Sequence, residues 1–246
     1  MPVQTMRSLT APERTSENNR RLGCALAFVA GAVNAGGFFA VGQYTSHMTG
    51  IVSSLADDLS IGSMALVAAG MSALTSFLLG AAVSAILINW GRRRGARSRF
   101  AMPLMLEALL LLCFGALGAH LEHERLFYVP LTVNLLCFVM GLQNAMVTKI
   151  SRAEIRTTHV TGLVTDIGIE LGKLAYWNGR SGSEPVLADR GKLGLLASLL
   201  SMFLCGALAG AFGFKQLGFV VTLPLAFVLV LMAIVPIIDD LIKPPA

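Results

Sequence analysis

Charged residues are scarce in this chain. They make up 13% of its 246 residues, whereas a soluble domain carries roughly 25%. Hydrophobic residues account for 55% of the sequence. So few charges are typical of a protein whose surface faces lipid rather than water. We therefore predict an all-α integral membrane protein, with the lipid bilayer as its main surroundings.

The signatures of several other protein classes are also missing. The four cysteines lie inside apolar runs, and none has the Cys-x-x-Cys spacing of a metal site. No Gly-x-Ser-x-Gly, His-Glu-x-x-His or phosphate-binding loop occurs. The 19 Lys and Arg lie between apolar stretches rather than on one basic face, which argues against nucleic-acid binding. We expect no enzyme activity, no cofactor, no metal and no nucleic-acid partner.

Six apolar stretches are long enough to cross a bilayer, which takes about 20 residues. They cover residues 22–42, 63–90, 102–120, 127–147, 193–213 and 217–238. The polar stretch 1–21 predicts a disordered tail. All Lys and Arg except Arg125 and Lys215 fall on one side of these spans. The positive-inside rule then places both termini in the cytoplasm of a multi-pass bacterial inner-membrane protein.

The most informative feature that is present is a motif that occurs twice. Residues 31–50 read GAVNAGGFFAVGQYTSHMTG, and residues 141–162 read GLQNAMVTKISRAEIRTTHVTG. Both copies begin with Gly-x-x-Asn-Ala and end with Thr-x-His-x-Thr-Gly. Phe77–Ala81 and Phe203–Ala207 extend the similarity into other spans. Each half supplies three spans, and an odd number inverts the second half. We predict two inverted repeats, residues 22–126 and 127–246.

The doubled motif supplies the candidate residues of a solute-binding site or pathway. They are Asn34, Thr45, His47, Thr49 and Gly50 in the first copy, and Gln143, Asn144, Thr157, His159, Thr161 and Gly162 in the second. The amides either line a solute path or bond across helices and fasten the bundle. The histidines are either structural hydrogen-bonding residues or proton-coupling groups, because imidazole titrates near physiological pH.

A short helical segment is predicted after each motif. It is either an amphipathic helix at the membrane interface, with threonine as its N-cap, or a broken helix whose first amides face a solute. Four acidic residues are secondary candidates: Asp58, Glu107, Asp166 and Glu170. We expect Glu107 either to reach the basic rim and pair with Arg99 or to serve a function inside the membrane.

These motifs resemble those of the YoaK family of bacterial inner-membrane proteins. The resemblance rests on Gly31–Ala35, Thr45–Gly50, Met140–Ala145 and Thr157–Gly162, and covers nearly the whole chain after residue 20. It implies six membrane spans and an uncharacterised function. Many members have Asp where Asn34 stands, and the absence of that carboxylate here disfavours cation binding at this position.

The inverted repeat and the paired polar motifs favour a secondary transporter of a small polar solute or ion, with the proton as a candidate coupling ion. The alternative is a non-transporting membrane scaffold or sensor subunit, whose polar motifs only hold helices together. The sequence assigns no oligomeric state.

Overall fold

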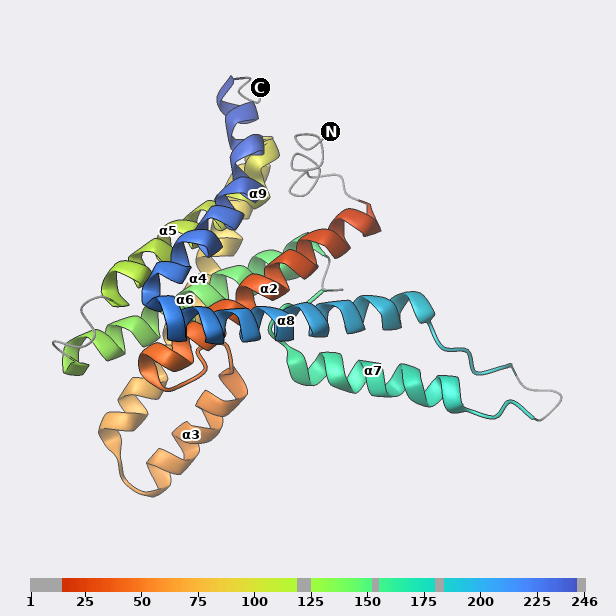
Figure 1. Cartoon of the computed structure of the whole chain (residues 1–246), viewed down its shortest axis with the longest axis horizontal. Coiled ribbons are helices and arrows are strands. Elements are labelled where there is room, and N and C mark those ends of the chain that lie inside the picture. The colour runs from red at the N-terminus through yellow and green to blue at the C-terminus, as the bar shows by residue number, and fades with distance from the viewer. Residues whose placement is uncertain (1–14, 119–124, 152–154, 180–183, 243–246) are drawn as a thin grey trace.

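The computed structural model describes residues 15–118, 125–151, 155–179 and 184–242. These residues form helices and connecting turns, with no strand among them, so the helical class is confirmed. The helices are α2 (Ser16–Val41), α3 (Met48–Ser60), α4 (Met64–Arg93), α5 (Ala101–Gly118), α6 (Arg125–Ile150), α7 (Val160–Ala175), α8 (Arg190–Leu217) and α9 (Thr222–Ile242), with 3-10 turns η1 (Arg97–Phe100) and η2 (Gly218–Val221) (Figure 1).

Five stretches of the described chain are long and apolar enough to cross a membrane. They are Glu17–Val41, Met64–Arg93, Arg97–Gly118, Tyr128–Ile150 and Arg190–Ile242. The last stretch contains both α8 and α9, joined by η2. Helices of this length and composition are those of a membrane-embedded protein.

Helix α2 begins at Ser16, inside the stretch for which the sequence predicted a disordered tail. Thr15 is the N-cap, and its side-chain oxygen accepts the N–H of Asn18 at 3.3 Å. One turn on, Arg21 pairs with Glu17 at 2.9 Å. These local bonds extend the helix through polar residues, which moves the predicted boundary at residue 21. Residues 1–14 lie outside the described part of the chain.

Two helix crossings share the same close contact. Helix α2 packs against α8, and α4 packs against α6. At each crossing glycines face backbone carbonyl groups that an added Cβ would overlap: two form a matching pair at both crossings, and a third, Gly210 against Ala32, belongs to the first crossing alone. The facing pairs are Gly31 with Phe203 and Gly206 with Phe28 in the first crossing, and Gly141 with Phe77 and Gly80 with Phe138 in the second. Small residues allow membrane helices to approach this closely.

The direction of each helix pair follows from its side-chain contacts. Along α2 and α8, Arg20 bonds to Ser198 and Gly36 faces Phe214, so the two helices run parallel. Helices α4 and α6 are parallel by the same test, since Ser72 bonds to Asn134 and Asn89 bonds to Lys149. Helices α5 and α9 run antiparallel: Ser98, just before α5, bonds to Asp240 near the end of α9, and Gly115 faces Thr222 at its start.

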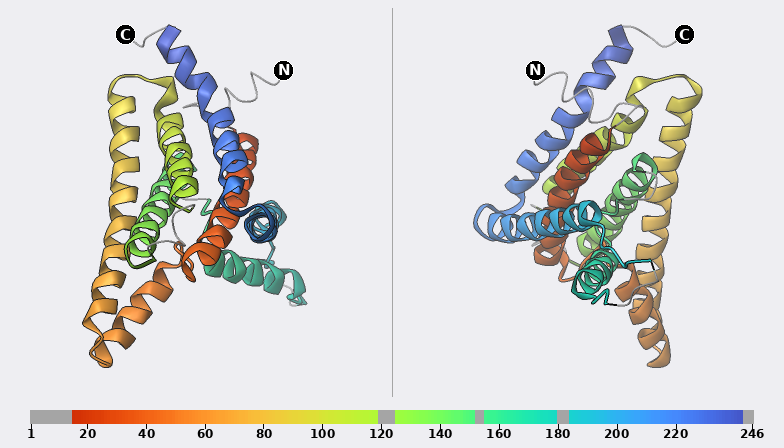
Figure 2. Two further views of the ribbon diagram at one scale, coloured as in Figure 1. Left: turned by 60° about the vertical axis from the view of Figure 1, so that its left-hand side comes forward. Right: turned by 90° about the vertical axis from the view of Figure 1, so that its right-hand side faces the viewer.

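The short helices α3 and α7 extend away from the centre. Helix α3 packs against α4, and α7 packs against α8, so each short helix forms a hairpin with the long helix that follows it (Figure 1). In the left view of Figure 2, α4 lies lengthwise while α8 is seen nearly end-on. The two hairpins therefore leave the centre in different directions.

Candidate functional site

Both copies of the motif reach one cavity of about 820 Å³. The first copy contributes Asn34, His47 and Thr49 to its wall, and the second contributes Asn144, His159 and Thr161. Phe77 and Phe203, from the two glycine crossings, also line it. Six candidate residues that are far apart in the sequence therefore lie around a single space.

Each asparagine joins its long helix to the loop that precedes a short helix. The Oδ1 atom of Asn34 accepts hydrogen bonds from the Oγ of Ser46 at 3.0 Å and from its backbone N–H at 3.4 Å. The Oδ1 atom of Asn144 accepts a hydrogen bond from the Oγ1 of Thr158 at 2.8 Å, and its Nδ2 donates to the carbonyl of Met140. The amides thus fix the position of each motif within its own half.

The two histidines occupy the N-cap positions of α3 and α7. Their backbone angles are nearly the same, with φ −91° and ψ 70° at His47 and φ −85° and ψ 60° at His159. Neither helix has a side-chain cap. The sequence predicted threonine at this position; the helices begin earlier because the histidine carbonyls already accept the N–H groups of Ile51 and Leu163 at 3.1 Å.

The glycine that ends each motif leaves room for the histidine ring. A Cβ on Gly50 would lie 2.6 Å from the Nδ1 of His47, and a Cβ on Gly162 would overlap with the Nδ1 of His159. Each imidazole therefore lies over the first turn of its own helix. In both copies, therefore, the glycine three residues after the histidine is explained by the same contact, because a side chain at that position would collide with the imidazole ring.

The electrostatics of the cavity are positive. Helices α3 and α7 both begin at its wall, and the N-terminal end of a helix carries partial positive charge and free N–H groups. Arg156 adds a full positive charge, and no Asp or Glu is among the described residues that line the cavity. Sequence reasoning missed Arg156 and Tyr44, although each directly precedes the threonine that opens the closing part of its motif.

Four other motif residues lie away from the wall. The side chains of Thr45 and Thr157 are fully buried, and their Oγ1 atoms have no hydrogen-bond partner among the described residues. Gly50 and Gly162 pack under the histidine rings. The motif is therefore part cavity wall and part support for that wall.

Glu107 and Gln143 form a separate buried pair. Gln143 is the residue before Asn144, and a rotation of about 100° per residue turns it to another face of α6. Its Nε2 donates to the Oε1 of Glu107 at 2.9 Å, and both side chains are fully buried. The predicted pairing of Glu107 with Arg99 is wrong: α5 begins at Ala101 and carries Glu107 inward, while the guanidinium of Arg99 lies over the ring of Phe100.

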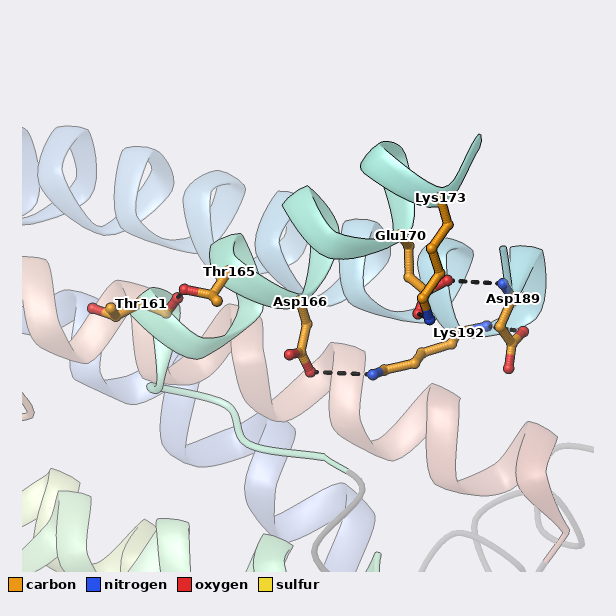
Figure 3. A network of polar contacts seen from close by, with 7 residues as sticks. All are labelled: Thr161, Thr165, Asp166, Glu170, Lys173, Asp189 and Lys192. Atoms are coloured by element: carbon orange, nitrogen blue, oxygen red, sulfur yellow. Dashed lines mark hydrogen bonds and ion pairs between the residues drawn. The ribbon is translucent and has the colours of Figure 1, made fainter. Parts of the chain in front are cut away.

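The acidic residues of α7 hold it to α8 (Figure 3). Glu170 accepts hydrogen bonds from the Nζ of Lys173 and the backbone N–H of Asp189, both at 2.8 Å. The bond from Lys173, followed by that from Asp189, lowers the pKa of Glu170 below its ordinary value. Asp166 pairs with Lys192 at 3.4 Å. These two candidates therefore support the hairpin and lie outside the cavity wall.

Asp58, the first-copy match of Glu170, lies beside a different cavity of about 490 Å³. Ser54 and Leu55 of α3 and Gly70 of α4 line the same space. The end of α2 and the start of α6 complete its wall, with Val41 and Val133 among the lining residues, and His47 borders both cavities. Asp58 is not among the residues of the larger cavity.

Comparison with protein-family models matches residues 22–235 to a family described as a protein of unknown function (DUF1275). No curated protein and no solved structure matches the chain.

Proposed function

Since the chain belongs to the DUF1275 family, whose function is unknown, we propose from its site that it is a secondary transporter of a small polar or anionic solute. A closer relation to the YoaK proteins stays a prediction. The observation that carries the proposal is the shared cavity: two copies of one motif, from the two halves of the chain, contribute the same residue types to its wall.

The proposed architecture is six membrane spans in two inverted repeats. If α2, α4, α5, α6, α8 and α9 each cross once, α2 and α8 must point the same way, as must α4 and α6, while α5 and α9 must oppose each other. The contacts agree with these directions within each pair, but α8 stands at a steep angle to α4 (Figure 2), so the six helices do not all share one common axis. The repeated glycine crossings support the equivalence of the halves. Such repeats commonly place a solute site at their interface.

The same architecture gives a proposed location and orientation. Almost all Lys and Arg fall on one side of the six proposed spans, which supports the proposal of a bacterial inner-membrane protein with both termini in the cytoplasm. Helices α3 and α7, one from each half of the chain, both start at the shared cavity.

The charge of the cavity defines the solute class. Two helix N-termini and Arg156 favour an anion or a solute with a carbonyl or hydroxyl oxygen. The paired histidines and asparagines supply further polar contacts. A volume of about 820 Å³ lies within the range of roughly 300–1,000 Å³ of ordinary small-molecule sites. We propose binding and passage rather than catalysis, because no described carboxylate in the wall orients either histidine.

Purified protein tests the proposal by thermal unfolding with a panel of acetate, nitrate, phosphate, urea and glycerol. We expect at least one of these solutes to raise the unfolding temperature. Thr161→Ala and Arg156→Gln should reduce that rise, because both residues line the cavity. Thr165→Ala is the matched control on the same helix: its hydroxyl bonds to the carbonyl of Thr161, outside the wall.

Flux into proteoliposomes with the stabilising solute then separates transport from binding alone. Uptake that depends on Arg156 supports the transporter. Protein that binds no solute from the panel, or binds one without moving it, supports the scaffold or sensor alternative. In that case Asn34→Ala and Asn144→Ala would lower stability only, by removing the bonds to Ser46 and Thr158.

A further inference from the structure

Glu107 is a carboxyl group in an apolar interior. The structure buries it fully where α5 meets α6, and the Nε2 of Gln143 also lies 3.5 Å from the carbonyl oxygen of Leu26 on α2. Its neighbours along α5, Leu104, Ala108 and Leu111, are at most 1% exposed. The pair with Gln143 is therefore closed off from solvent by three helices.

Two hydrogen-bond acceptors in this pair have no donor. Gln143 donates to the Oε1 of Glu107, but the Oε2 of Glu107 and the Oε1 of Gln143 are both buried and unpartnered among the described residues. An ionised carboxylate accepts hydrogen bonds only, whereas a protonated carboxyl also donates one. A single proton on the Oε2 of Glu107 would turn that atom into a donor, and the amide oxygen of Gln143 is an acceptor in the same pair that lacks one.

We propose that Glu107 is a proton-binding site, held as a neutral carboxylic acid in an acid–amide pair with Gln143. The amide N–H of Gln143 donates to Oε1 of the acid, and the acid O–H donates to the amide oxygen. Burying an unpaired carboxylate is costly, so the group takes up a proton or a cation. This proposal stands whether or not the larger cavity transports a solute.

Among the described residues, no cation compensates the charge of an ionised Glu107. None of the ion pairs of the described residues includes it. Nearby described charged groups have other partners or are exposed. Arg20 bonds to Ser198, Arg21 pairs with Glu17, and Lys149 bonds to Asn89. Asp240 accepts N–H groups of η1, Arg94 and Arg99 lie over Trp90 and Phe100, and Arg92, Arg93 and Arg97 are exposed.

The pair occurs in one half only. Residues 102–104 read Met-Pro-Leu and residues 223–225 read Leu-Pro-Leu, so the two prolines are matching positions of the halves. Alignment on these prolines places Val228 opposite Glu107, and alignment of Gly31 with Gly141 places Val33 opposite Gln143. Both halves form the same glycine crossing, so the crossing does not require the pair. The pair is therefore not part of the repeated architecture, and proton binding is the role that we propose for it.

Infrared spectroscopy of the purified protein at neutral pH tests this directly. A protonated carboxyl gives a C=O stretch above the amide I band, and the stretch shifts to lower frequency in D₂O. We expect this band in the wild type and its loss in Glu107→Gln, an isosteric change that keeps a hydrogen-bonding pair. Glu17→Gln, at an exposed site, is the control and should keep the band.

Gln143→Leu tests the acid–amide pair itself. The stretch should move to higher frequency in this variant, because the carbonyl loses the amide donor. A wild type without the band would overturn the proton site, and a band unchanged by Gln143→Leu would overturn the pair. If Glu107→Gln does not fold, wild type labelled with ¹³C-carboxyl glutamate identifies the band by its isotope shift, since the other described glutamates are exposed or, at Glu170, ion-paired.

Discussion

The glycine crossings yield the sharpest prediction about stability. In Gly31→Ala the new Cβ would overlap with the carbonyl oxygen of Phe203. A backbone carbonyl cannot rotate away as a side chain can, and heavy atoms pack best at about 3.5–4.0 Å. Helices α2 and α8 would therefore separate by on the order of 1 Å, which forfeits a quarter to a half of each affected contact energy.

The expected magnitude follows from two opposing terms. Overpacking costs typically about 1–3 kcal/mol, and the upper value applies here because backbone is the obstacle. Replacing glycine by alanine inside a helix returns about 1 kcal/mol. We expect a net loss of about 2 kcal/mol in the free energy of unfolding for Gly31→Ala, and a similar loss for its match Gly141→Ala, which meets Phe77 in the same way.

Equilibrium unfolding in mixed detergent micelles measures this loss. Gly194→Ala in α8 is the control, because an added Cβ there meets nothing within 4 Å, and this variant should be neutral or slightly stabilised. If Gly31→Ala is as stable as Gly194→Ala, the close crossing is refuted. If Gly31→Ala and Gly141→Ala differ widely, the equivalence of the two halves is refuted.

Three further predictions concern the ends of the helices. The lowered pKa of Glu170 adds stability that is fully present above the ordinary glutamate pKa of about 4.3. That stability is lost as pH falls through the lower folded value, so the protection of α7 amides against hydrogen exchange, relative to the intrinsic rate at each pH, should fall on acidification. Glu170→Gln should lack this dependence. Asp240→Ala removes the acceptor of two η1 N–H groups and should cost about 1–3 kcal/mol in thermal unfolding. Gly50→Ala should displace the ring of His47 and weaken solute-induced stabilisation, while the unfolding temperature without solute changes little.

Several features of the fold were predictable because they depend on local sequence. Each predicted apolar stretch coincides with a long helix, since about 20 apolar residues in succession favour a helix in lipid. The helix start at Ser16 was missed because polar residues conceal a helix that local bonds extend. Histidine as N-cap was missed because threonine is the commoner cap, and only the backbone path showed where α3 and α7 begin.

The candidate site was predictable only as a set of residues. The doubled motif identified Asn34, His47, Asn144 and His159 without showing which side chains share a space. Glu107 illustrates the limit: its position early in a span suggested the basic rim, yet the rotation of α5 turns it toward Gln143. No pattern in the sequence relates these two residues, which lie on different helices.

The sequence by itself determined that this is an apolar helical protein with an internal repeat, because composition, span length and motif spacing are properties of the linear chain. The tertiary structure alone decided that both motifs border one cavity and that Glu107 and Gln143 form a closed pair. The shared cavity depends on how closely α2 approaches α8 and α4 approaches α6, whereas the closed pair depends on how α5 meets α6. Five glycines of the described residues permit that approach, but only the assembled backbone shows which carbonyl each of them faces.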